Sequence, residues 1–433
     1  MKSSIHIIMA LESFFPYSNG GTENSVIQLA RYLSEKGYKI TILTPDDSGK
    51  RNINWIENIN IRYFNSPLVF PKEETFGLKE TSNLPSFKRM LEILQPDILH
   101  LQSFSPALNS YHIKAAKELG VKTIYTLRLA NNFCINNGEL VQKGKYVCNS
   151  RVLNIKCQSC NLIRYKIKSP PEAYIFSFVA EFFSVLNYYP KKISTYYYRA
   201  NAKKKELKRT AKYTDAVISI SNWVTKAFQI NNFRNISEIK QGIDYQIRQN
   251  KLFSIFPVVF TFIGRFSPEK GIDILISTLN CFSEQDFILN IISIEQNEDK
   301  VHFENVMNNC KFKGKIKLKY NLSTEQVYEE LEKTHWLCLF SKIRDTAPRA
   351  IHEAFACQVP SIVSQHIPDF VEHNVNGLRI NIDKEEEISS VFRRIFNDFS
   401  IWERLKSAIK PPRNISQVGQ DHELLYHQIM NSK

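Results

Sequence analysis

Two cations follow a strongly apolar segment of this sequence, where they could bind a phosphate group. The segment Val258–Ile263 is followed by Gly264 and Arg265, and Lys270 comes five residues later. A continuous apolar run of this kind predicts a strand that is covered on both faces. Ligands of open α/β sheets bind beyond the carboxyl ends of the strands, where an arginine fork and a lysine point charge could clamp a diphosphate. Taken alone, the two residues could equally be solvated surface cations.

A second polar segment, residues 344–354, combines two carboxylates with the expected start of a helix. Pro348 suits the first turn of a helix, whose N-terminus would offer free backbone N–H groups to a phosphate. These groups belong to Ala347, Arg349 and Ala350. Asp345 and Glu353 could accept hydrogen bonds from the hydroxyls of a sugar and a ribose. The alternative is that Asp345 caps the helix and Glu353 lies on its solvated face.

A pair of glycines, Gly20 and Gly21, lies in the polar loop Asn19–Thr22. Glycine lets backbone amides approach a phosphate that a Cβ atom would exclude. On its own a Gly-Gly pair indicates only a turn. Because this loop and the two segments above each join an expected strand to an expected helix, we expect one cleft between two successive domains to contain all three.

The remaining pattern alternates strands and helices in both halves of the chain. A length of 433 residues with 43% hydrophobic content suffices for two domains. Strands are expected at Ile5–Met9, Lys39–Leu43, Asp97–Leu101, Lys122–Leu127, Ala216–Ser221, Val258–Ile263, Phe287–Ile292, Lys315–Tyr320, Trp336–Phe340 and Ser361–Val363. Helices are expected at Thr324–Leu331 and Ile351–Ala356. The pattern predicts an α/β fold with parallel-sheet domains at 1–248 and 249–416, and a C-terminal helix within 417–433 that crosses back to the first domain.

The chain carries a formal net charge of +14, which favours polyanionic partners such as nucleic acid, anionic lipid or phosphorylated substrates. No nucleic-acid recognition motif accompanies this charge, which argues against nucleic acid. No segment has the roughly 20 consecutive apolar residues of a membrane span, and the first residues lead into a strand rather than a secretory signal. The sequence therefore predicts a cytoplasmic chain with reduced cysteines.

The segment Ala173–Tyr189 is heavily aromatic, and lysines flank it on both sides. These lysines are Lys166, Lys168, Lys191 and Lys192. One interpretation is a packed helix of the first domain. The other is an amphipathic surface helix that docks on an anionic membrane leaflet. Glu181 in the middle of the segment argues against a membrane span.

Four of the eight cysteines fall within one short stretch, with the spacing Cys-x13-Cys-x8-Cys-x2-Cys. They are Cys134, Cys148, Cys157 and Cys160. The Cys-x2-Cys half is typical of a tetrahedral zinc site, so the spacing predicts a structural zinc that shapes the acceptor side rather than performing catalysis. The alternatives are four unligated thiols or a transient disulfide.

These residues together resemble the family 4 glycosyltransferases of the GT-B fold, also described as glycosyl transferases group 1, over nearly the whole chain. The matching residues are Gly20–Gly21, Ser221, Gly242–Asp244, Gly264–Arg265, Lys270–Gly271 and Pro348–Pro360. The resemblance implies two Rossmann-like domains that face each other across a cleft. It also implies a retaining, metal-independent transfer of a sugar from a UDP- or GDP-sugar to a glycan or lipid-linked acceptor, as in bacterial surface polysaccharide and lipopolysaccharide synthesis at the inner membrane.

The resemblance also assigns roles to individual residues. Arg265 and Lys270 would hold the diphosphate, while Asp345 and Glu353 would contact the transferred sugar and the ribose. The leaving diphosphate would itself deprotonate the acceptor hydroxyl, with Arg128 stabilising charge. The implied donor-binding set is Gly20, Gly21, Arg265, Lys270, Asp345, Ala347, Pro348, Arg349 and Glu353. The Asp-x-Asp motif of metal-dependent enzymes is not evident.

This sequence departs from the family pattern at three places. Asp345 replaces the first glutamate of the usual pair and is one methylene shorter. Gln358 lies where the family has glycine, and Gln365 and His366 lie in a region commonly rich in glycine, which would reshape the base pocket. Arg128 replaces a histidine, and a guanidinium is a poor general base. Two alternatives therefore stay open, a catalytically idle partner protein and a sugar-nucleotide epimerase, and donor turnover would discriminate between them.

Overall fold

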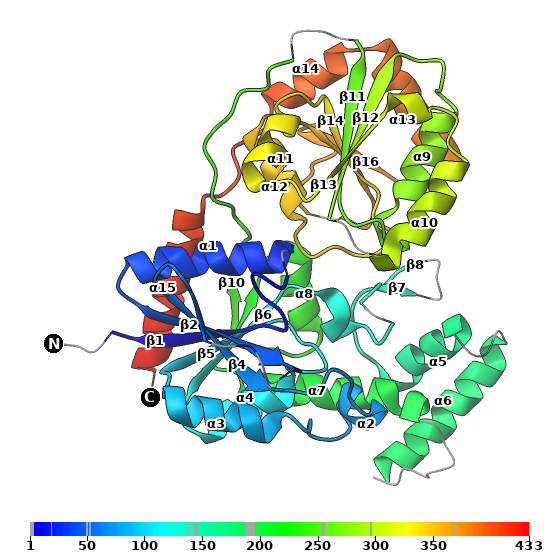
Figure 1. Ribbon diagram of the computed structural model, residues 1–433. Helices are drawn as coiled ribbons and strands as arrows, with labels where there is room; N and C mark the ends of the chain where they lie inside the picture. Colours follow the sequence, from blue (N-terminus) through cyan, green and yellow to red (C-terminus); the bar gives the residue numbers. More distant parts are fainter. Residues whose placement is uncertain are drawn as a thin grey trace. The chain divides into compact units, whose positions relative to one another are not determined.

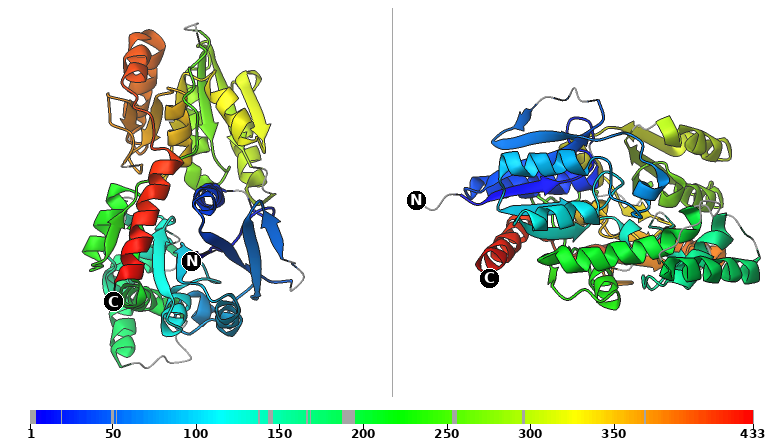
Figure 2. Two further views of the ribbon diagram at one scale, coloured as in Figure 1. Left: turned by 90° about the vertical axis from the view of Figure 1, so that its left-hand side faces the viewer. Right: turned by 90° about the horizontal axis from the view of Figure 1, so that it is seen from below.

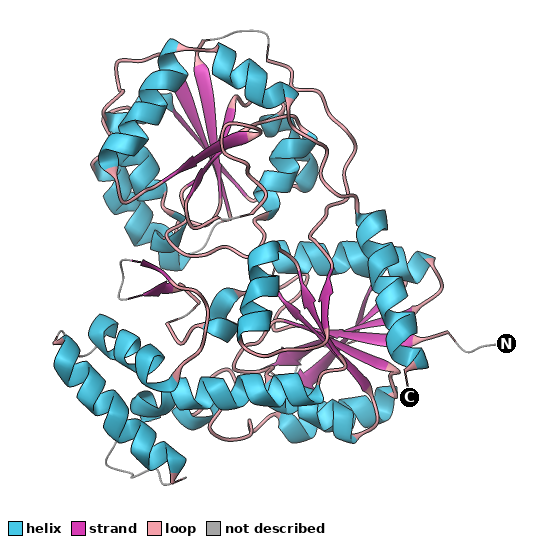
Figure 3. Cartoon of the chain, turned by 180° about the vertical axis from the view of Figure 1, so that it is seen from behind, coloured by secondary structure: helices cyan, strands magenta, loops and turns pink. Residues whose placement is uncertain are grey.

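A computed structural model describes residues 4–432 except 19, 49–50, 52, 137, 143–145, 166, 168, 187–194, 253–255, 295–296 and 368. Asn19, Lys166, Lys168, Lys191 and Lys192, which the sequence analysis names, therefore lie outside the described residues. The chain forms two compact units, Met1–Gln241 with Ile415–Lys433, and Gly242–Asn414. Their boundaries fall a few residues before the predicted positions at 248 and 416. In each unit, helices cover both faces of one sheet (Figure 3).

The sheet of the first unit has the strand order β10-β9-β6-β5-β1-β2-β4-β3 (Figure 1). All of its neighbouring strands are parallel except β3 and β4, which pair antiparallel. The bounds are β1 His6–Ala10, β2 Lys39–Asp46, β3 Asn54–Ile56, β4 Ile59–Asn65, β5 Ile98–Gln102, β6 Lys122–Leu127, β9 Ala216–Ser219 and β10 Ile236–Glu238. After β1 the chain forms β2, β3 and β4 on one side of it, and then β5, β6, β9 and β10 on the other side. The β1–β5 boundary is therefore a topological switch point, at which open α/β sheets bind ligands.

The first unit contains helices α1 Gly21–Glu35, α2 Lys72–Thr75, α3 Leu84–Leu94, α4 Ser110–Glu118, α5 Asn154–Tyr165, α6 Pro170–Val185, α7 Arg199–Tyr213, α8 Asn222–Ile230 and α15 Ile415–Asn431. Short helices η1 Ala130–Phe133 and η2 Thr195–Tyr198 and the hairpin β7 Val141–Gln142 with β8 Tyr146–Val147 complete it. Within the described ranges, no helix is both long enough and apolar enough to pass through a bilayer.

The C-terminal helix α15 packs on the first unit (Figure 2). The hydroxyl of Tyr32 on α1 donates to Glu423 Oε2 at 2.8 Å. The hydroxyl of Tyr426 lies 2.8 Å from Nδ1 of the buried His100 on β5. Burial lowers the pKa of His100 well below its usual value, so this imidazole is neutral at physiological pH. Polar contacts as well as apolar packing thus hold α15 against a helix and a strand distant in sequence.

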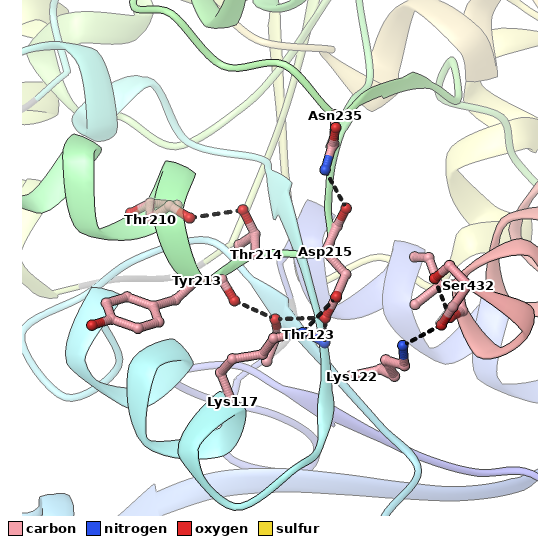
Figure 4. Close-up of polar contacts among 10 residues, drawn as sticks. Lys117, Lys122, Thr123, Thr210, Tyr213, Thr214, Asp215, Asn235 and Ser432 are labelled. Carbon is pink, nitrogen blue, oxygen red and sulfur yellow. Dashed lines mark hydrogen bonds and ion pairs between the residues drawn. The ribbon is translucent and has the colours of Figure 1, made fainter.

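A polar network joins several elements at the amino ends of β6 and β9 (Figure 4). The carboxylate of Asp215 accepts the backbone N–H of Thr123 at 2.8 Å and the Lys117 ammonium at 2.6 Å. Lys122 Nζ donates to the backbone carbonyl of Ser432, just after α15, at 2.8 Å. These bonds lie at the amino ends of the strands. The ligands of α/β proteins bind at the opposite end of the sheet, beyond the carboxyl ends of the strands.

The sheet of the second unit has the strand order β13-β12-β11-β14-β15-β16 and is parallel throughout. The bounds are β11 Val258–Ile263, β12 Phe287–Ser293, β13 Ile316–Tyr320, β14 Trp336–Leu339, β15 Ser361–Ser364 and β16 Gly377–Ile380. Its α-helices are α9 Ile272–Asn280, α10 Asn297–Asn308, α11 Thr324–Leu331, α12 Arg349–Ala356, α13 Glu385–Asn397 and α14 Ser400–Ser407. Phe260 in β11 contacts Phe392 and Phe396 of α13 in the core. The switch point of this sheet lies between β11 and β14.

Candidate active site

The switch point of the second unit brings together two of the segments singled out by the sequence. One loop follows β11 and contains Lys270, and the other follows β14 and contains Asp345. Lys270 Nζ lies 3.0 Å from Asp345 Oδ2, although the two residues are 75 positions apart. The hydroxyl of Ser341 donates to the same carboxylate oxygen at 2.8 Å. The sequence analysis missed Ser341, although its position directly after the predicted strand Trp336–Phe340 was a usable signal.

The backbones of these two loops are also connected. The backbone N–H of Lys342 donates to the carbonyl of Glu269 at 2.8 Å, and Lys342 Nζ lies 2.6 Å from Asp273 Oδ2. Gly271 has a left-handed φ of 72°, and a Cβ added there would lie 2.0 Å from the carbonyl oxygen of Phe340. Only glycine fits this close approach. The position of Lys270 therefore depends on the next residue being glycine.

Arg265 and Lys270 differ in whether a carboxylate neutralises their positive charge. Arg265 is exposed, and no described residue forms an ion pair with it. Lys270 is partly neutralised by Asp345. An ammonium group has three N–H donors, so Lys270 can still donate to a phosphate oxygen while it contacts the carboxylate. Both cations thus keep the capacity to bind an anion, as the sequence predicts, and their contact with a diphosphate stays a prediction.

Helix α12 begins at Arg349, and Pro348 is the residue before it, one position earlier than expected. Arg349 Nε donates to Glu353 Oε1 at 2.7 Å, and Glu353 is only 8% exposed. The alternative of a Glu353 on a solvated face is therefore wrong. Asp345 is not the N-cap residue of this helix, because that position is occupied by Pro348. Glu353 is instead a buried carboxylate held in position by an arginine one turn earlier.

Gln365 and His366 follow β15 and contact neighbouring turns. The Gln365 side chain donates to Asp383 Oδ2 at 3.0 Å and accepts the N–H of Ile382 at 2.9 Å. The backbone carbonyl of His366 accepts the N–H of Asp345 at 3.3 Å. Burial lowers the pKa of His366, which favours the neutral imidazole. His366 thus connects the region after β15 to the loop that carries Asp345.

The backbone conformation at Gln358 explains why the family has glycine at this position. It follows the C-cap residue of α12 and adopts a left-handed φ of 56°. Glycine is favoured at such a position because any side chain strains the left-handed conformation. Gln358 is exposed, so its side chain gains no burial in return.

We expect Gln358→Gly to raise the free energy of unfolding by about 1 kcal/mol, because it relieves this strain. Urea denaturation of the variant and the parent would measure the difference. Gln358→Ala is the control, since alanine keeps a Cβ atom and should give no comparable gain. Equal stability of the glycine and alanine variants would contradict the explanation.

In the first unit, the glycine loop is closed by a buried carboxylate. Glu23 Oε2 accepts the backbone N–H of Gly20 at 3.1 Å, and its Oε1 accepts the Ser18 hydroxyl at 2.5 Å. A Cβ added at Gly20 would lie 2.7 Å from Glu23 Oε2, whereas one at Gly21 would point into open space. A side chain at position 20 would therefore require the Glu23 carboxylate to move, and the approach of a phosphate to this loop stays a prediction.

Arg128 follows β6 and is buried within the first unit. Its Nε donates to Gln102 Oε1 at 2.8 Å and its guanidinium donates to Gln241 Oε1 at 3.2 Å. Gln241 in turn donates to Ser25 on α1 at 2.8 Å. Burial lowers the pKa of Arg128 to about 10, so the guanidinium stays charged at neutral pH. The residue carries a positive charge near the switch point, and its predicted role in stabilising the reaction is untested.

A cavity of 180 Å³ lies in the first unit, near the carboxyl ends of the central strands. Its lining residues are Thr75, Phe76, Phe104, Ser105, Pro106, Cys134, Ile135, Arg199, Lys203 and Glu206. The Arg199 guanidinium lies 4.7 Å from the centre of the Phe76 ring, and Lys203 forms an ion pair with Glu206. The sequence analysis missed this cavity, because the residues that line it come from four separate stretches of the chain.

Cys134, one of the four clustered cysteines, lines the cavity, and none of the eight cysteines of the chain forms a disulfide. Asn136 donates to two of the thiols, from its backbone to Cys134 at 3.4 Å and from its side chain to Cys160 at 3.6 Å. Burial raises the pKa of Cys157 to about 12. Among the described residues no group of three or more Cys, His, Asp or Glu side chains is arranged to hold a metal ion. The four thiols nevertheless lie near one another, since Cys134, Cys148 and Cys160 all help to raise the pKa of Cys157, and structural zinc stays a prediction of the sequence alone.

Comparison with family models and with solved structures identifies the family of this chain. Residues 19–129 match the model of Glycosyltransferase Family 4, and residues 246–410 match that of Glycosyl transferases group 1. A human protein, one of the subunits of phosphatidylinositol N-acetylglucosaminyltransferase, is 23% identical over 125 residues, which are 29% of this chain and 26% of the human one. The match thus spans about a quarter of that relative's length.

Solved structures agree with the fold over the whole chain. Sucrose-phosphate synthase from Thermosynechococcus elongatus superimposes with a TM-score of 0.68 at 14% identity, covering 98% of this chain and 99% of that one. Anabaena HepE, solved in complex with UDP and glucose, gives a TM-score of 0.64 at 13% identity, covering 98% and 100%. At these identities the likeness concerns the fold alone. Taken with the two family models, it makes this chain a glycosyltransferase that belongs to family 4 and has two Rossmann-like units of the GT-B type.

Proposed function

We propose that this glycosyltransferase moves a sugar from a nucleotide diphosphate donor, a UDP- or GDP-sugar, to a glycan or lipid-linked acceptor with retention at the anomeric carbon. The observation that carries the proposal is the meeting of Lys270, Asp345 and Ser341 at the switch point of the second unit. The UDP and glucose in the similar Anabaena structure support a UDP-sugar. The name of the human relative, which refers to phosphatidylinositol, supports a lipid-linked acceptor.

In the proposed reaction, the acceptor oxygen forms the new bond to the anomeric carbon on the face from which the diphosphate leaves. The electron pair of the breaking C–O bond goes to the diphosphate, and a diphosphate oxygen takes the proton of the acceptor hydroxyl. Arg265, Lys270 and the backbone amides at the start of α12 offset the growing negative charge. This scheme needs neither a protein nucleophile nor a bound metal ion.

The two carboxylates of the second unit would hold the donor's hydroxyl groups. Asp345 would accept hydrogen bonds from the transferred sugar, and its bonds from Lys270 and Ser341 fix its orientation. Glu353 would accept from the ribose, and Arg349 fixes it in the same way. Because each carboxylate is already oriented in the chain, little conformational entropy would be lost on donor binding.

The acceptor side of the proposal rests on the first unit. We assign the cavity near α2 and α7 to part of the acceptor, because it combines aromatic rings with polar and charged groups. Arg128 would contribute a fixed positive charge rather than a proton acceptor. The expected setting is synthesis of bacterial surface polysaccharide or lipopolysaccharide precursors, by a cytoplasmic protein peripheral to the inner membrane.

Mass spectrometry of the reaction products would test this proposal. The purified chain would be incubated with a panel of UDP- and GDP-sugars and with lipid-phosphate-linked and free oligosaccharides. We expect one acceptor to gain the mass of one sugar residue while a nucleoside diphosphate is released. A donor isomer of the same mass, separated from the original donor by chromatography, together with unchanged acceptor would indicate an epimerase instead. Donor left intact with every acceptor would indicate a catalytically idle partner.

A further inference from the structure

Helix α6 exposes a row of large apolar side chains along its length. The most exposed are Ile175 at 63%, Phe178 at 64%, Phe182 at 59% and Val185 at 71%. Their spacings of three, four and three residues place them on one side of the helix. We call this side, together with its neighbours Tyr174, Phe176, Val179 and Leu186, the α6 apolar face. Every member of this set is at least 40% exposed.

The opposite side of α6 carries small residues, and these are the ones that are buried. Ala173, Ser177, Ala180 and Ser184 are at most 4% exposed, and α6 packs side by side with α5 (Figures 1 and 3). The serines fit this surface, since the Ser177 hydroxyl donates to the carbonyl of Ala173 at 2.6 Å. A helix of a water-soluble domain normally buries its large apolar side chains. In α6 the pattern is reversed, and the large side chains form an exposed apolar surface of the kind that marks an interaction site.

The α6 apolar face is also broad. At 100° per residue, the exposed apolar positions from Tyr174 round to Phe176 cover roughly 200° of the helix circumference. A coiled-coil partner needs only the narrow seam formed by two positions in seven. A surface of this breadth suits the boundary between the headgroups and acyl chains of a bilayer, where aromatic and aliphatic side chains are buried together.

The net charge of the chain is concentrated in the part of the sequence that contains α6. Residues 151–213, which include α5, α6 and α7, carry 14 Lys and Arg against three Glu. This excess of 11 accounts for most of the formal net charge of +14. On α6 itself the acidic residues are Glu172 in the first turn and Glu181, which accepts a hydrogen bond from Asn154 on α5. Anionic headgroups attract juxtamembrane basic residues by about 1 kcal/mol each.

We propose that α6 docks this protein on an anionic lipid bilayer. The helix lies along the surface, with its small face on α5 and its apolar face in the headgroup–acyl boundary. The surrounding lysines and arginines contact anionic headgroups. Because α7 carries Arg199 and Lys203 of the cavity and α5 packs on α7, docking brings the cavity near lipid-carried molecules. The inference adds a lipid partner to the proposed function and is tested without donor or acceptor.

Vesicle flotation would test the docking. Purified protein would be mixed with phosphatidylcholine vesicles that either contain or lack phosphatidylglycerol, at low and high salt. We expect flotation with the anionic vesicles at low salt, and about tenfold weaker partition without phosphatidylglycerol or at high salt. A parent protein that does not float with anionic vesicles would overturn the proposal.

The triple variant Ile175→Ser, Phe178→Ser, Phe182→Ser tests the apolar face directly. We expect its partition onto anionic vesicles to fall at least about tenfold, because three large apolar groups no longer enter the bilayer. The matched control is Leu68→Ser, Val69→Ser, which changes two apolar residues of the same unit that are 80% and 79% exposed. Equal flotation of the triple variant and this control would overturn the proposal.

Two further measurements distinguish lost docking from misfolding and from self-association. The thermal midpoint of the triple variant should match that of the parent, because the replaced side chains face solvent; if it drops, the single variant Phe178→Ser takes its place in the flotation assay. Sedimentation should show the same oligomeric state for both proteins. If the parent is a dimer and the triple variant is a monomer, the proposal is overturned in favour of a second copy of this chain as the partner.

Donor turnover by the triple variant in aqueous solution separates a failure of docking from a failure of the transferase assignment.

Discussion

Lys270→Ala and Arg265→Ala should each lower kcat for sugar transfer about 30- to 1000-fold, equivalent to about 2 to 4 kcal/mol of transition-state stabilisation. The negative charge that develops on the departing diphosphate makes the contribution of these cations larger in the transition state than in the bound donor. Turnover of the donor at saturating concentration would measure the effect. KM should change less than kcat, because the interaction strengthens during bond cleavage.

A matched control for this prediction lies elsewhere in the second unit. Lys319 forms an ion pair with Glu330 at 2.5 Å, and its side chain is about as exposed as that of Lys270. Lys319→Ala therefore removes a comparable salt bridge that has no proposed contact with the donor, and we expect it to retain the parent's kcat. If Lys270→Ala and Arg265→Ala behaved like Lys319→Ala, the diphosphate would be bound elsewhere and the assigned roles would be wrong.

Gly271→Ala should lower the free energy of unfolding by at least about 2 kcal/mol. We also expect the folded variant to lose most of the parent's activity. Two effects combine at this position. The φ of 72° is strained for any residue with a side chain, and the new Cβ atom would lie 2.0 Å from the Phe340 carbonyl oxygen. Because that oxygen belongs to the backbone next to β14, the chain itself must move. Such a movement separates the loops that carry Lys270 and Asp345.

Chemical denaturation of Gly271→Ala beside Gly314→Ala would measure this effect. An added Cβ at Gly314 meets no atom within 4 Å and its φ is not left-handed, so we expect a change below about 0.5 kcal/mol. If both variants unfolded at the same denaturant concentration, the close approach of the two loops would not hold in solution.

Local patterns determined much of the second unit. The apolar run at 258–263 predicted β11 with its observed bounds, and the pattern at 324–331 likewise predicted α11. These elements are recognisable because buried strands and amphipathic helices each require a periodicity that is visible within a few residues. The sequence analysis missed β3, β7, β8 and β10, which have two or three residues each, and also β4 and β16, which are largely buried. A strand of two or three residues is too short to show a period, whereas the alternation of apolar and polar residues in β4 was a usable signal.

The aromatic segment shows where local pattern was insufficient. The sequence predicts a helix there, and the observed helix α6 spans Pro170–Val185. The sequence could not decide between a packed helix and a docking surface, because a broad apolar side fits either role. The tertiary structure decided which side faces α5. The small residues do, and the large apolar ones are left exposed.

The sequence by itself determined that two cations follow one strand and that two carboxylates belong to a later loop and helix. Only the tertiary structure decided that these residues meet. Their meeting depends on β14 lying beside β11, with Phe260 paired to Trp336, although β12 and β13 come between them in the chain. Strand order is fixed by hydrogen bonds and packing between distant segments, and no periodicity within either segment records which neighbour it will choose. Lys270 and Asp345, 75 residues apart, became one site for that reason.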